Sequence, residues 1–280
     1  MILPSRVNAL EEALNRFVVT VEVVPPAGPD VEAILSALEA LAGLPVDGFS
    51  VATNPVAKPR MSALALCALA QRRTGRPAIL HCTTRDHNRL SLQGLLWGAR
   101  ALAVGTVLVT TGDFVALGDR ASTTTVRDVD VFDLVRMARQ AGLRTGVVLN
   151  PYPESDGLEQ AVRRLERKVA TGAQFAVTQP LYDEASAVAL IAAIAHVGIP
   201  MIMGILPLRT PRHAEFLHNQ VAGIVVPQSV RARMARVGDP VAEGVANARE
   251  MLALARKHFA GACLMPPFDR YEMLFDILSE

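Results

Sequence analysis

A single glutamate lies within the first apolar run of this sequence. The run is FVVTVEVV, residues 17–24, where Glu22 stands among valines, and Pro25 and Pro26 follow directly. A carboxyl group with little access to water has a raised pKa, so it can hold a proton near neutral pH and act as a general acid. Glu22 is therefore a candidate catalytic acid, and the alternative is a structural ion pair with an arginine or lysine of the same fold.

Other polar side chains stand where later apolar runs end. His81 lies in ILHCTT, Asp113 lies in TTGDF, and Gln179 ends AQFAVTQ. An amide at the end of an apolar strand needs hydrogen-bond partners, which makes Gln179 a candidate ligand contact. The alternatives are a core position for His81 and a helix cap or a turn for Asp113. The further polar residues at run ends are Thr53, Asn54, Thr83, Thr84, Arg85, Thr110, Thr111, Asn150, Thr178 and, beyond the last run, Arg270.

Eight short apolar runs can position these side chains, and helical patterns separate the runs. The runs are 17–24, 47–53, 77–84, 105–111, 143–150, 173–179, 199–205 and 261–266. Amphipathic segments with helix-period apolar positions include 30–44, 60–73, 86–104 and 157–173. Apolar strands without regular alternation are typical of a parallel sheet covered on both faces, and eight strand–helix units close a barrel. The sequence therefore predicts an α/β fold, a single-domain (β/α)8 TIM barrel over residues 1–280.

The predicted barrel also indicates where the chemistry lies. Active sites of such barrels are built at the carboxyl ends of the strands, so the candidate side chains should meet at one mouth. The alternative fold is a doubly wound parallel sheet, which usually carries a Gly-rich nucleotide loop, and no G-x-G-x-x-G follows any of the eight runs. The first 17 residues resemble a short amphipathic helix, in which Pro4, Glu11 and Glu12 fit neither a signal peptide nor a transit peptide.

Composition narrows the class of protein. A chain of 280 residues with 51% hydrophobic and 20% charged residues can bury a sizeable core. The formal net charge of +1, without a Lys/Arg-rich block, argues against a nucleic-acid partner. No uninterrupted apolar run approaches the length of about 18 residues that a membrane span needs. We therefore expect a soluble cytoplasmic protein.

The three cysteines and the absence of metal-binding motifs exclude further classes. Cys67, Cys82 and Cys263 are widely spaced, with no C-x-x-C pair, which favours buried thiols over a disulfide framework or a zinc site. The sequence has no H-E-x-x-H, no G-x-S-x-G and no cluster of acids at metal-ligand spacing, so metallohydrolase and serine-hydrolase chemistry is not expected. We predict no metal site.

Five segments together resemble the methylenetetrahydrofolate reductases and follow the order of that family. They are VEVVPP, ILHCTTRDHNRLSLQGLLWGARALAVGTVLVTTGD, RKVATGAQFAVTQPLYD, GIPMIMGILPLRTPRHAEFLHN and CLMPPFDRYE. The sequences of these segments are most similar to the reductase half of bifunctional proteins that join a homocysteine methyltransferase to this barrel. The cysteine set that a zinc–thiolate methyltransferase needs is absent from the sequence, so we expect the reductase barrel alone.

The resemblance implies a function and a set of roles. A barrel of this family holds FAD without a Rossmann motif, takes a hydride from NAD(P)H and passes it to 5,10-methylenetetrahydrofolate by ping-pong kinetics. By motif, Glu22 corresponds to the acid that helps open the methylene bridge, and Asp113 to the residue that contacts the pterin and tunes the flavin. The positions that correspond to folate contacts are Gln179, Arg270 and Leu217, where Leu217 replaces an aromatic residue. The positions that correspond to flavin contacts are Thr53, His81, Thr111, Asp113, Asn150, Arg167 and Lys168.

The sequence departs from the family pattern at two flavin positions. Thr111 stands where some relatives have an arginine, and Asn150 stands where relatives have an aromatic residue, with Tyr152 two positions later. Fewer charged contacts imply weaker flavin binding. Alternatives remain a Schiff-base aldolase or phosphate-binding isomerase, for which no strand lysine or Gly-rich loop is found, and a folate-binding or reductase subunit. Such a subunit would act only with a partner methyltransferase or electron donor, and we otherwise expect a homo-oligomer.

Overall fold

The computed structural model describes residues 16–152 and 157–279. The helix expected over residues 1–17 falls almost entirely outside these ranges. No helix within them is long and apolar enough to cross a membrane. Cys67, Cys82 and Cys263 are buried free thiols, as predicted.

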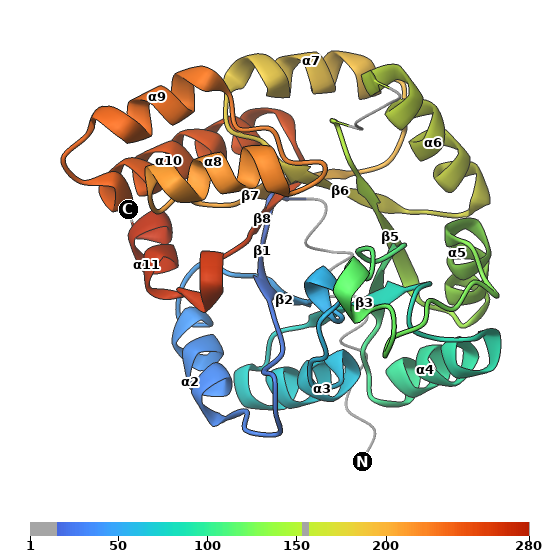
Figure 1. The fold of residues 1–280 in the computed structure, drawn as a ribbon. Helices are drawn as coiled ribbons and strands as arrows, with labels where there is room; N and C mark the ends of the chain where they lie inside the picture. The colour runs from blue at the N-terminus through green and yellow to red at the C-terminus, as the bar shows by residue number, and fades with distance from the viewer. Residues whose placement is uncertain (1–15, 153–156, 280) are drawn as a thin grey trace.

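Eight parallel strands form a closed barrel in chain order, which confirms the predicted (β/α)8 fold (Figure 1). Each strand lies on one of the eight predicted runs, and only β6 extends past its run, by Pro180. The strands are β1 (Val18–Val23), β2 (Gly48–Val51), β3 (Ala78–Thr83), β4 (Thr106–Thr110), β5 (Arg144–Leu149), β6 (Phe175–Pro180), β7 (Met201–Ile205) and β8 (Gly261–Leu264).

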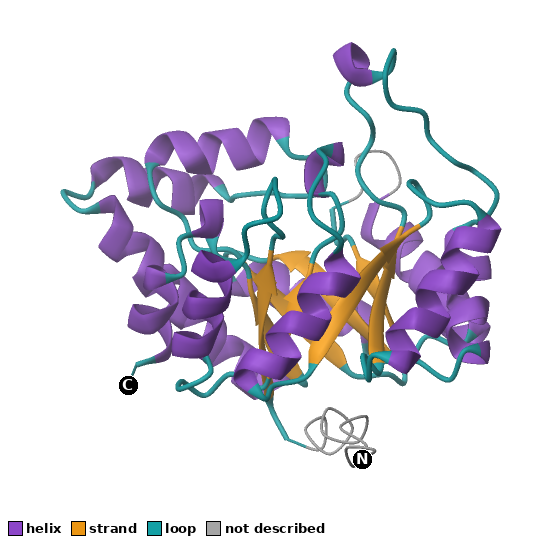
Figure 2. Cartoon of the chain, turned by 90° about the horizontal axis from the view of Figure 1, so that it is seen from below, coloured by secondary structure: helices purple, strands orange, loops and turns teal. Residues whose placement is uncertain are grey.

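Helices surround the barrel on its outside, and long loops extend from one of its ends (Figure 2). Short 3-10 turns lie in three of the loops that follow strands, η2 (Pro55–Ala57), η3 (Leu117–Asp119) and η4 (Pro267–Asp269). The helices of the described residues are α2 (Glu32–Leu41), α3 (Ala63–Thr74), α4 (Arg89–Ala101), α5 (Val131–Gln140), α6 (Gly157–Thr171), α7 (Glu184–Ile194), α8 (Pro211–Gln220), α9 (Gln228–Arg236), α10 (Pro240–His258) and α11 (Glu272–Leu278).

Capping side chains define where loops end and helices begin. Asn88 accepts a hydrogen bond from Ser91 N at 2.9 Å at the start of α4, and Asp130 accepts one from Asp133 N at 2.7 Å at the start of α5. Such caps satisfy backbone N–H groups that the first helical turn leaves unpaired. Asp183, Thr210 and Asp239 cap α7, α8 and α10 in the same way.

Residues of β1 alternate between the two faces of the barrel wall. Val19, Val21 and Val23 belong to the large core between strands and helices. Val18 belongs instead to a small cluster inside the barrel, together with Ile79, Leu108, Phe175, Val177, Ile202 and Cys263. Because side chains two residues apart on a strand share a face, Glu22 points into the barrel like Val18.

The interior of the barrel is filled by side chains rather than open. A Cβ atom at Gly146 would lie 2.2 Å from the Phe175 ring, so the ring occupies the space that a side chain on β5 would need. The barrel therefore has a packed floor beneath its carboxyl end. Ligand chemistry is restricted to the strand ends and the loops that follow them.

Candidate active site

Glu22 lies near the carboxyl end of β1, facing the interior, and keeps partial access to solvent. Burial and then the negative charge of Asp113 raise the pKa of Glu22 to about 7. Glu22 forms no ion pair or hydrogen bond with any residue that the structure describes. Burial and then the charge of Glu22 raise the pKa of Cys263 to about 12, which places the β8 thiol in the same neighbourhood. Among the described residues Glu22 therefore has no ion-pair partner, and its role as a proton donor stays a prediction.

His81 and Thr53 are held by the protein beside this group. Glu22 is in register with Ser50 of β2, and Ser50 Oγ lies 2.8 Å from His81 Nε2. Thr53 Oγ1 donates to the carbonyl oxygen of His81 at 2.6 Å. Burial lowers the pKa of His81 to about 4, so the ring is neutral at pH 7. These are the partners of a satisfied histidine, and the flavin contacts of His81 and Thr53 stay predictions.

Asp113 follows β4 in the turn TTGD and is exposed at the mouth. One of its carboxylate oxygens, Oδ2, accepts a hydrogen bond from the backbone N–H of Val56 in η2. The turn requires glycine at position 112, because φ is +81° and a Cβ would lie 3.2 Å from Thr83. The remaining oxygen, Oδ1, has no hydrogen bond to a described residue, so it is available to a ligand.

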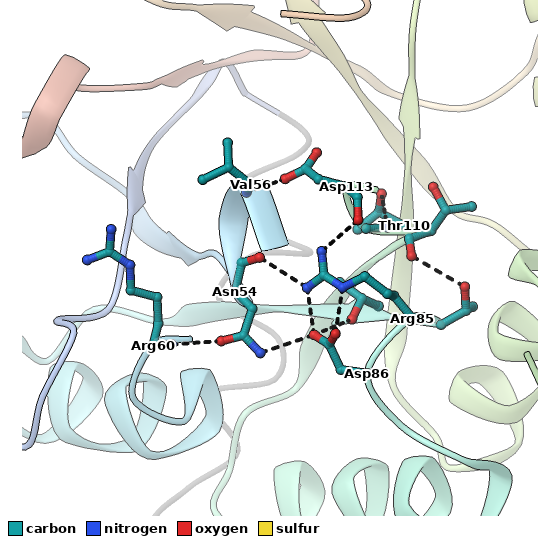
Figure 3. A network of polar contacts seen from close by, with 11 residues as sticks. Asn54, Val56, Arg60, Arg85, Asp86, Thr110 and Asp113 are labelled. Carbon is teal, nitrogen blue, oxygen red and sulfur yellow. Dashed lines mark hydrogen bonds and ion pairs between the residues drawn. The ribbon is translucent and has the colours of Figure 1, made fainter. Parts of the chain in front are cut away.

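A polar network that the sequence analysis did not identify supports Asp113 (Figure 3). Arg85 is buried, pairs with Asp86, and donates hydrogen bonds to the carbonyl oxygens of Asn54 and Asp113. Arg85 and Asn54 were recognisable only as polar residues at strand ends. The useful signal was the pair RD directly after an apolar strand, because an arginine is rarely buried without a charged partner.

Gln179 and Asn150 differ in the hydrogen-bond partners of their side-chain amides. Gln179 is half-buried near the end of β6, and its amide makes no hydrogen bond with a described residue. Asn150, just after β5, accepts a hydrogen bond from Tyr152 N at 2.8 Å, and its side chain packs against Gly223. Gln179 therefore has its full hydrogen-bonding capacity for a ligand, whereas Asn150 uses its carbonyl group in a local turn.

Arg167 and Lys168, adjacent in α6, have different surroundings. Lys168 Nζ donates to the carbonyl oxygen of Val148 in β5 at 2.8 Å, and burial followed by the charge of Arg164 lowers its pKa to about 8. The Arg167 guanidinium lies 4.5 Å from the centre of the Phe132 ring in α5. Both cations belong to the wall formed by β5, α5 and α6, and a half-buried ammonium there suits an anionic group such as a diphosphate.

The remaining predicted contacts are Arg270, Thr111 and Leu217. Arg270 follows η4, is exposed, and pairs with Glu272 at 3.2 Å. Thr111 is exposed at the end of β4. Leu217 of α8 is only 5% exposed and belongs to a separate cluster with Tyr182 and neighbours from α9. A ligand could reach Leu217 only if that cluster opened, so its predicted folate contact gains no support from the structure.

One cavity of the described residues does not coincide with this mouth. It has a volume of about 700 Å³, and its lining includes Tyr152, Leu158, Ser186, Leu190 and His218. None of the predicted site residues lines it. Within residues 16–152 and 157–279, no group of three or more His, Cys, Asp or Glu side chains could hold a metal ion. Glu22 and Asp113 are close enough for the Asp113 charge to raise the pKa of Glu22, and their catalytic roles stay predictions.

Solved structures share the barrel at low sequence identity. A protein from Clostridium thermocellum that binds two copies of 5-methyl-5,6,7,8-tetrahydrofolic acid superposes with a TM-score of 0.70 and 13% identity, over 97% of this chain and 96% of that chain. 2,3-Dimethylmalate lyase, of the PEP mutase/isocitrate lyase superfamily, gives a TM-score of 0.57 and 15% identity over 96% and 84% of the chains. Oxaloacetate acetylhydrolase with bound oxalate gives 0.58 and 13% over 97% and 83%. At these identities the likenesses establish the fold alone.

The amino-acid sequence shows a more specific relationship than these structural likenesses do. The profile of the methylenetetrahydrofolate reductase family matches residues 7–258, which include all strands of the barrel except β8. The match therefore covers Glu22, the TTGD turn with Asp113, and Gln179, and it includes the first four of the five motifs, whereas CLMPPFDRYE with Arg270 lies beyond it. This chain belongs to the methylenetetrahydrofolate reductase family.

Proposed function

We propose that this protein reduces 5,10-methylenetetrahydrofolate to 5-methyltetrahydrofolate with NAD(P)H, in a ping-pong reaction that depends on FAD. The observation that carries the proposal is the Glu22 carboxyl group at the carboxyl end of β1. Burial and the Asp113 charge raise its pKa to about 7, and no cation of the described residues pairs with it. The family assignment supports the reaction class. The barrel from Clostridium thermocellum that binds 5-methyltetrahydrofolic acid supports a reduced folate as the ligand.

Glu22 supplies the proton that the reaction needs. When the methylene bridge opens, the bond from its carbon to one folate nitrogen breaks, and that nitrogen takes the proton of Glu22. The carbon is left as an iminium on the other nitrogen and becomes a methyl group when it accepts a hydride. A carboxyl group with a pKa near 7 is protonated often enough to act as the acid and leaves a carboxylate after transfer.

Asp113 and Gln179 orient the folate in this proposal. The free Oδ1 of Asp113 can accept a hydrogen bond from the pterin, and its negative charge stabilises the positive charge of the iminium. The Gln179 amide can donate to and accept from the pterin edge, since it has no partner among the described residues. Arg270, exposed beyond β8, offers a cation for the carboxylates of the folate tail.

The residues of the mouth fit a flavin on the side of β2 to β5. Lys168 brings a half-buried ammonium to β5, and Thr53, His81, Thr111 and Asn150 bring neutral polar groups to the ends of β2, β3, β4 and β5. Bound FAD would supply the hydride chemistry that no side chain can perform. With Thr111 in place of an arginine, the charge for a bound flavin would come mainly from Arg167 and Lys168, so we expect part of the flavin to be lost during purification.

A second candidate function is favoured by exposed apolar side chains in the loops after β2 and β4. Val56, Phe114 and Leu117 are 65%, 94% and 79% exposed. Large exposed apolar residues that gather on one rim are typical of a surface that another molecule covers. In this alternative the protein is a folate-binding or reductase subunit that acts only beside a partner methyltransferase or electron donor.

One anaerobic spectroscopic experiment separates these functions. The protein is reconstituted with FAD, and its flavin absorption band is followed on addition of NADH or NADPH and then of 5,10-methylenetetrahydrofolate. The proposed reaction predicts that the band bleaches and then returns as 5-methyltetrahydrofolate forms. Protein that binds the folate but stays inert with added FAD and NAD(P)H supports the subunit alternative. Full reductase activity without flavin would refute the proposed mechanism.

A further inference from the structure

Arg85 connects three loops of the barrel mouth. It lies just after β3, and its side chain is 5% exposed. Its Nη2 donates to the carbonyl oxygen of Asn54 after β2 at 3.0 Å, and its Nη1 donates to the carbonyl oxygen of Asp113 after β4 at 2.9 Å. Figure 3 shows the guanidinium between these two chain segments. The loops after β2, β3 and β4 are therefore joined through one side chain.

The charge of this buried arginine is balanced locally. Asp86 accepts two hydrogen bonds from Arg85, Nε to Oδ1 at 2.5 Å and Nη2 to Oδ2 at 2.7 Å. Asp86 also accepts from Asn54 Nδ2 at 3.1 Å and from Thr83 Oγ1 at 3.3 Å. Burial alone would raise the pKa of Asp86, but hydrogen bonds from Arg85 and Asn54 outweigh it and lower the pKa. Because the pair is saturated by its neighbours, neither member has a free group to offer as an acid or a nucleophile.

The loop after β2 is held in a conformation that its residues disfavour. Asn54 has φ +43°, and Val56 and Ala57 have φ +50° and +55°. A positive φ is a true outlier for a β-branched residue such as Val56 and persists only where surrounding contacts impose it. Here the Arg85 bond to Asn54 fixes one end of the turn. The turn then directs the Val56 N–H at Oδ2 of Asp113.

Arg85 thus acts on Asp113 from two sides. It binds the Asp113 carbonyl directly, and through Asn54 it sets the Val56 N–H that holds one carboxylate oxygen. The backbone of Arg85 adds a third restraint, because its carbonyl accepts from Val126 N at 2.9 Å near the far end of the same β4–α5 loop. The position of Asp113 is therefore restrained by a residue whose own side chain is buried.

We propose that Arg85 is a positioning residue of the reaction, which orients the Asp113 carboxylate toward the folate by clamping the loops after β2 and β4 to the end of β3. This inference rests on the proposed function. Loss of the clamp should slow the step in which Asp113 faces the substrate and leave hydride transfer from NAD(P)H nearly unchanged. Misplacement of an orienting group by about 1 Å can cost roughly 100-fold in rate.

The test compares Arg85→Met and Arg85→Lys with a matched control, Arg73→Met. Arg73 also pairs with two carboxylates, Glu32 and Glu39, but it does so on the outer surface between α2 and α3. Stopped-flow mixing measures the two half-reactions separately. We expect Arg85→Met to slow the folate half-reaction about 100-fold and Arg85→Lys at least about 10-fold, because an ammonium cannot reproduce the planar fork of contacts. The control should stay within about two-fold of wild type.

A double variant shows whether Arg85 acts through Asp113. In the Asp113→Asn background, Arg85→Met should change the folate half-reaction by no more than about two-fold, since residues of one network are not additive. Additive effects, or equal slowing of both half-reactions, would overturn the proposal. So would failure of both Arg85 variants to fold, because Arg85 would then be a residue of the fold.

Hydrogen exchange separates this inference from the proposed function. Measured by mass spectrometry, Arg85→Met should raise amide exchange at residues 54–57 and 111–116 by at least about 10-fold, and Arg73→Met should not. Unchanged exchange in both segments overturns the clamp even if the wild type is an active reductase. Wild-type protein without flavin-dependent reaction, but with this exchange pattern, rejects the proposed function and retains the clamp.

Discussion

Replacing Glu22 with glutamine separates the position of this side chain from its acid chemistry. Burial and then the Asp113 charge raise the pKa of Glu22 from 4.5 to about 7, so between these pH values the folded protein holds a proton that the unfolded chain releases. The contribution of Glu22 to wild-type stability therefore falls as pH rises from about 4.5 to about 7 and is constant above that range. Glutamine does not titrate, so the variant lacks this fall.

The pKa of Glu22 sets the size of the effect. One pKa unit corresponds to about 1.4 kcal/mol, which gives about 3 kcal/mol for a fully buried carboxyl group. Glu22 keeps partial access to solvent, so we expect Glu22→Gln to gain about 2 kcal/mol relative to wild type between pH 4.5 and pH 8. Urea unfolding of both proteins at a series of pH values measures this difference. The buried histidines titrate in the same range, but they contribute equally to both proteins and cancel.

Kinetics of the same variant complete the test. The folate half-reaction should fall roughly 10²- to 10⁴-fold, the usual contribution of a positioned general acid, and flavin reduction by NAD(P)H should stay within about three-fold. A stability difference that does not change with pH would refute the raised pKa. Equal slowing of both half-reactions, or a variant that does not fold, would show that Glu22 has a structural role and that the acid mechanism is wrong.

Three further substitutions test individual groups of the mouth. Asp113→Asn removes a charge that raises the pKa of Glu22, so the pH profile of the folate half-reaction should move to lower pH and the flavin potential should rise; unchanged values would make Asp113 a turn residue. Lys168→Met should weaken FAD binding about 10-fold at pH 7. Titrations followed by flavin fluorescence should show that the FAD affinity of wild type falls as pH rises through about 8, whereas the affinity of the variant does not change. Burial lowers the pKa of His81 to about 4, so the wild-type free energy of unfolding should fall by about 2 kcal/mol on acidification from pH 6.5 to about 4, and His81→Gln should not show this fall. An equal pH dependence of urea unfolding in both proteins would contradict this.

The barrel was predictable because its signal is local and repeated. Eight separate apolar runs became β1 to β8, since a strand buried on both faces needs no particular pairing to be recognised. Expected helix segments such as 86–104 and 157–173 contain α4 and α6 for the same reason. The helix ends were less exact, because side-chain caps such as Asn88 act within two or three residues and are hard to tell from other polar loop residues.

The candidate site was predictable by residue type and position, but not by partner. Glu22, His81 and Gln179 lie on strands, near their carboxyl ends, as the apolar runs around them indicated. Their inward direction became clear only from the core clusters of the structure. The sequence did not reveal that His81 would pair with Ser50, or that Leu217 would be buried in a separate cluster. Such partners come from neighbouring strands or helices, and strand register and helix rotation are properties of the assembled barrel.

By itself the sequence determined the fold class and the presence of a carboxylate among valines, because apolar runs and residue chemistry are local. Only the tertiary structure decided the electrostatics of that carboxylate and the support of Asp113. The pKa of Glu22 depends on burial by the closed barrel and on a charge ninety-one positions later in the chain. Pairing of β2, β3 and β4 brings Asn54 and Asp113 within hydrogen-bond distance of the Arg85 guanidinium, and distance in space is what electrostatic and hydrogen-bond energies depend on.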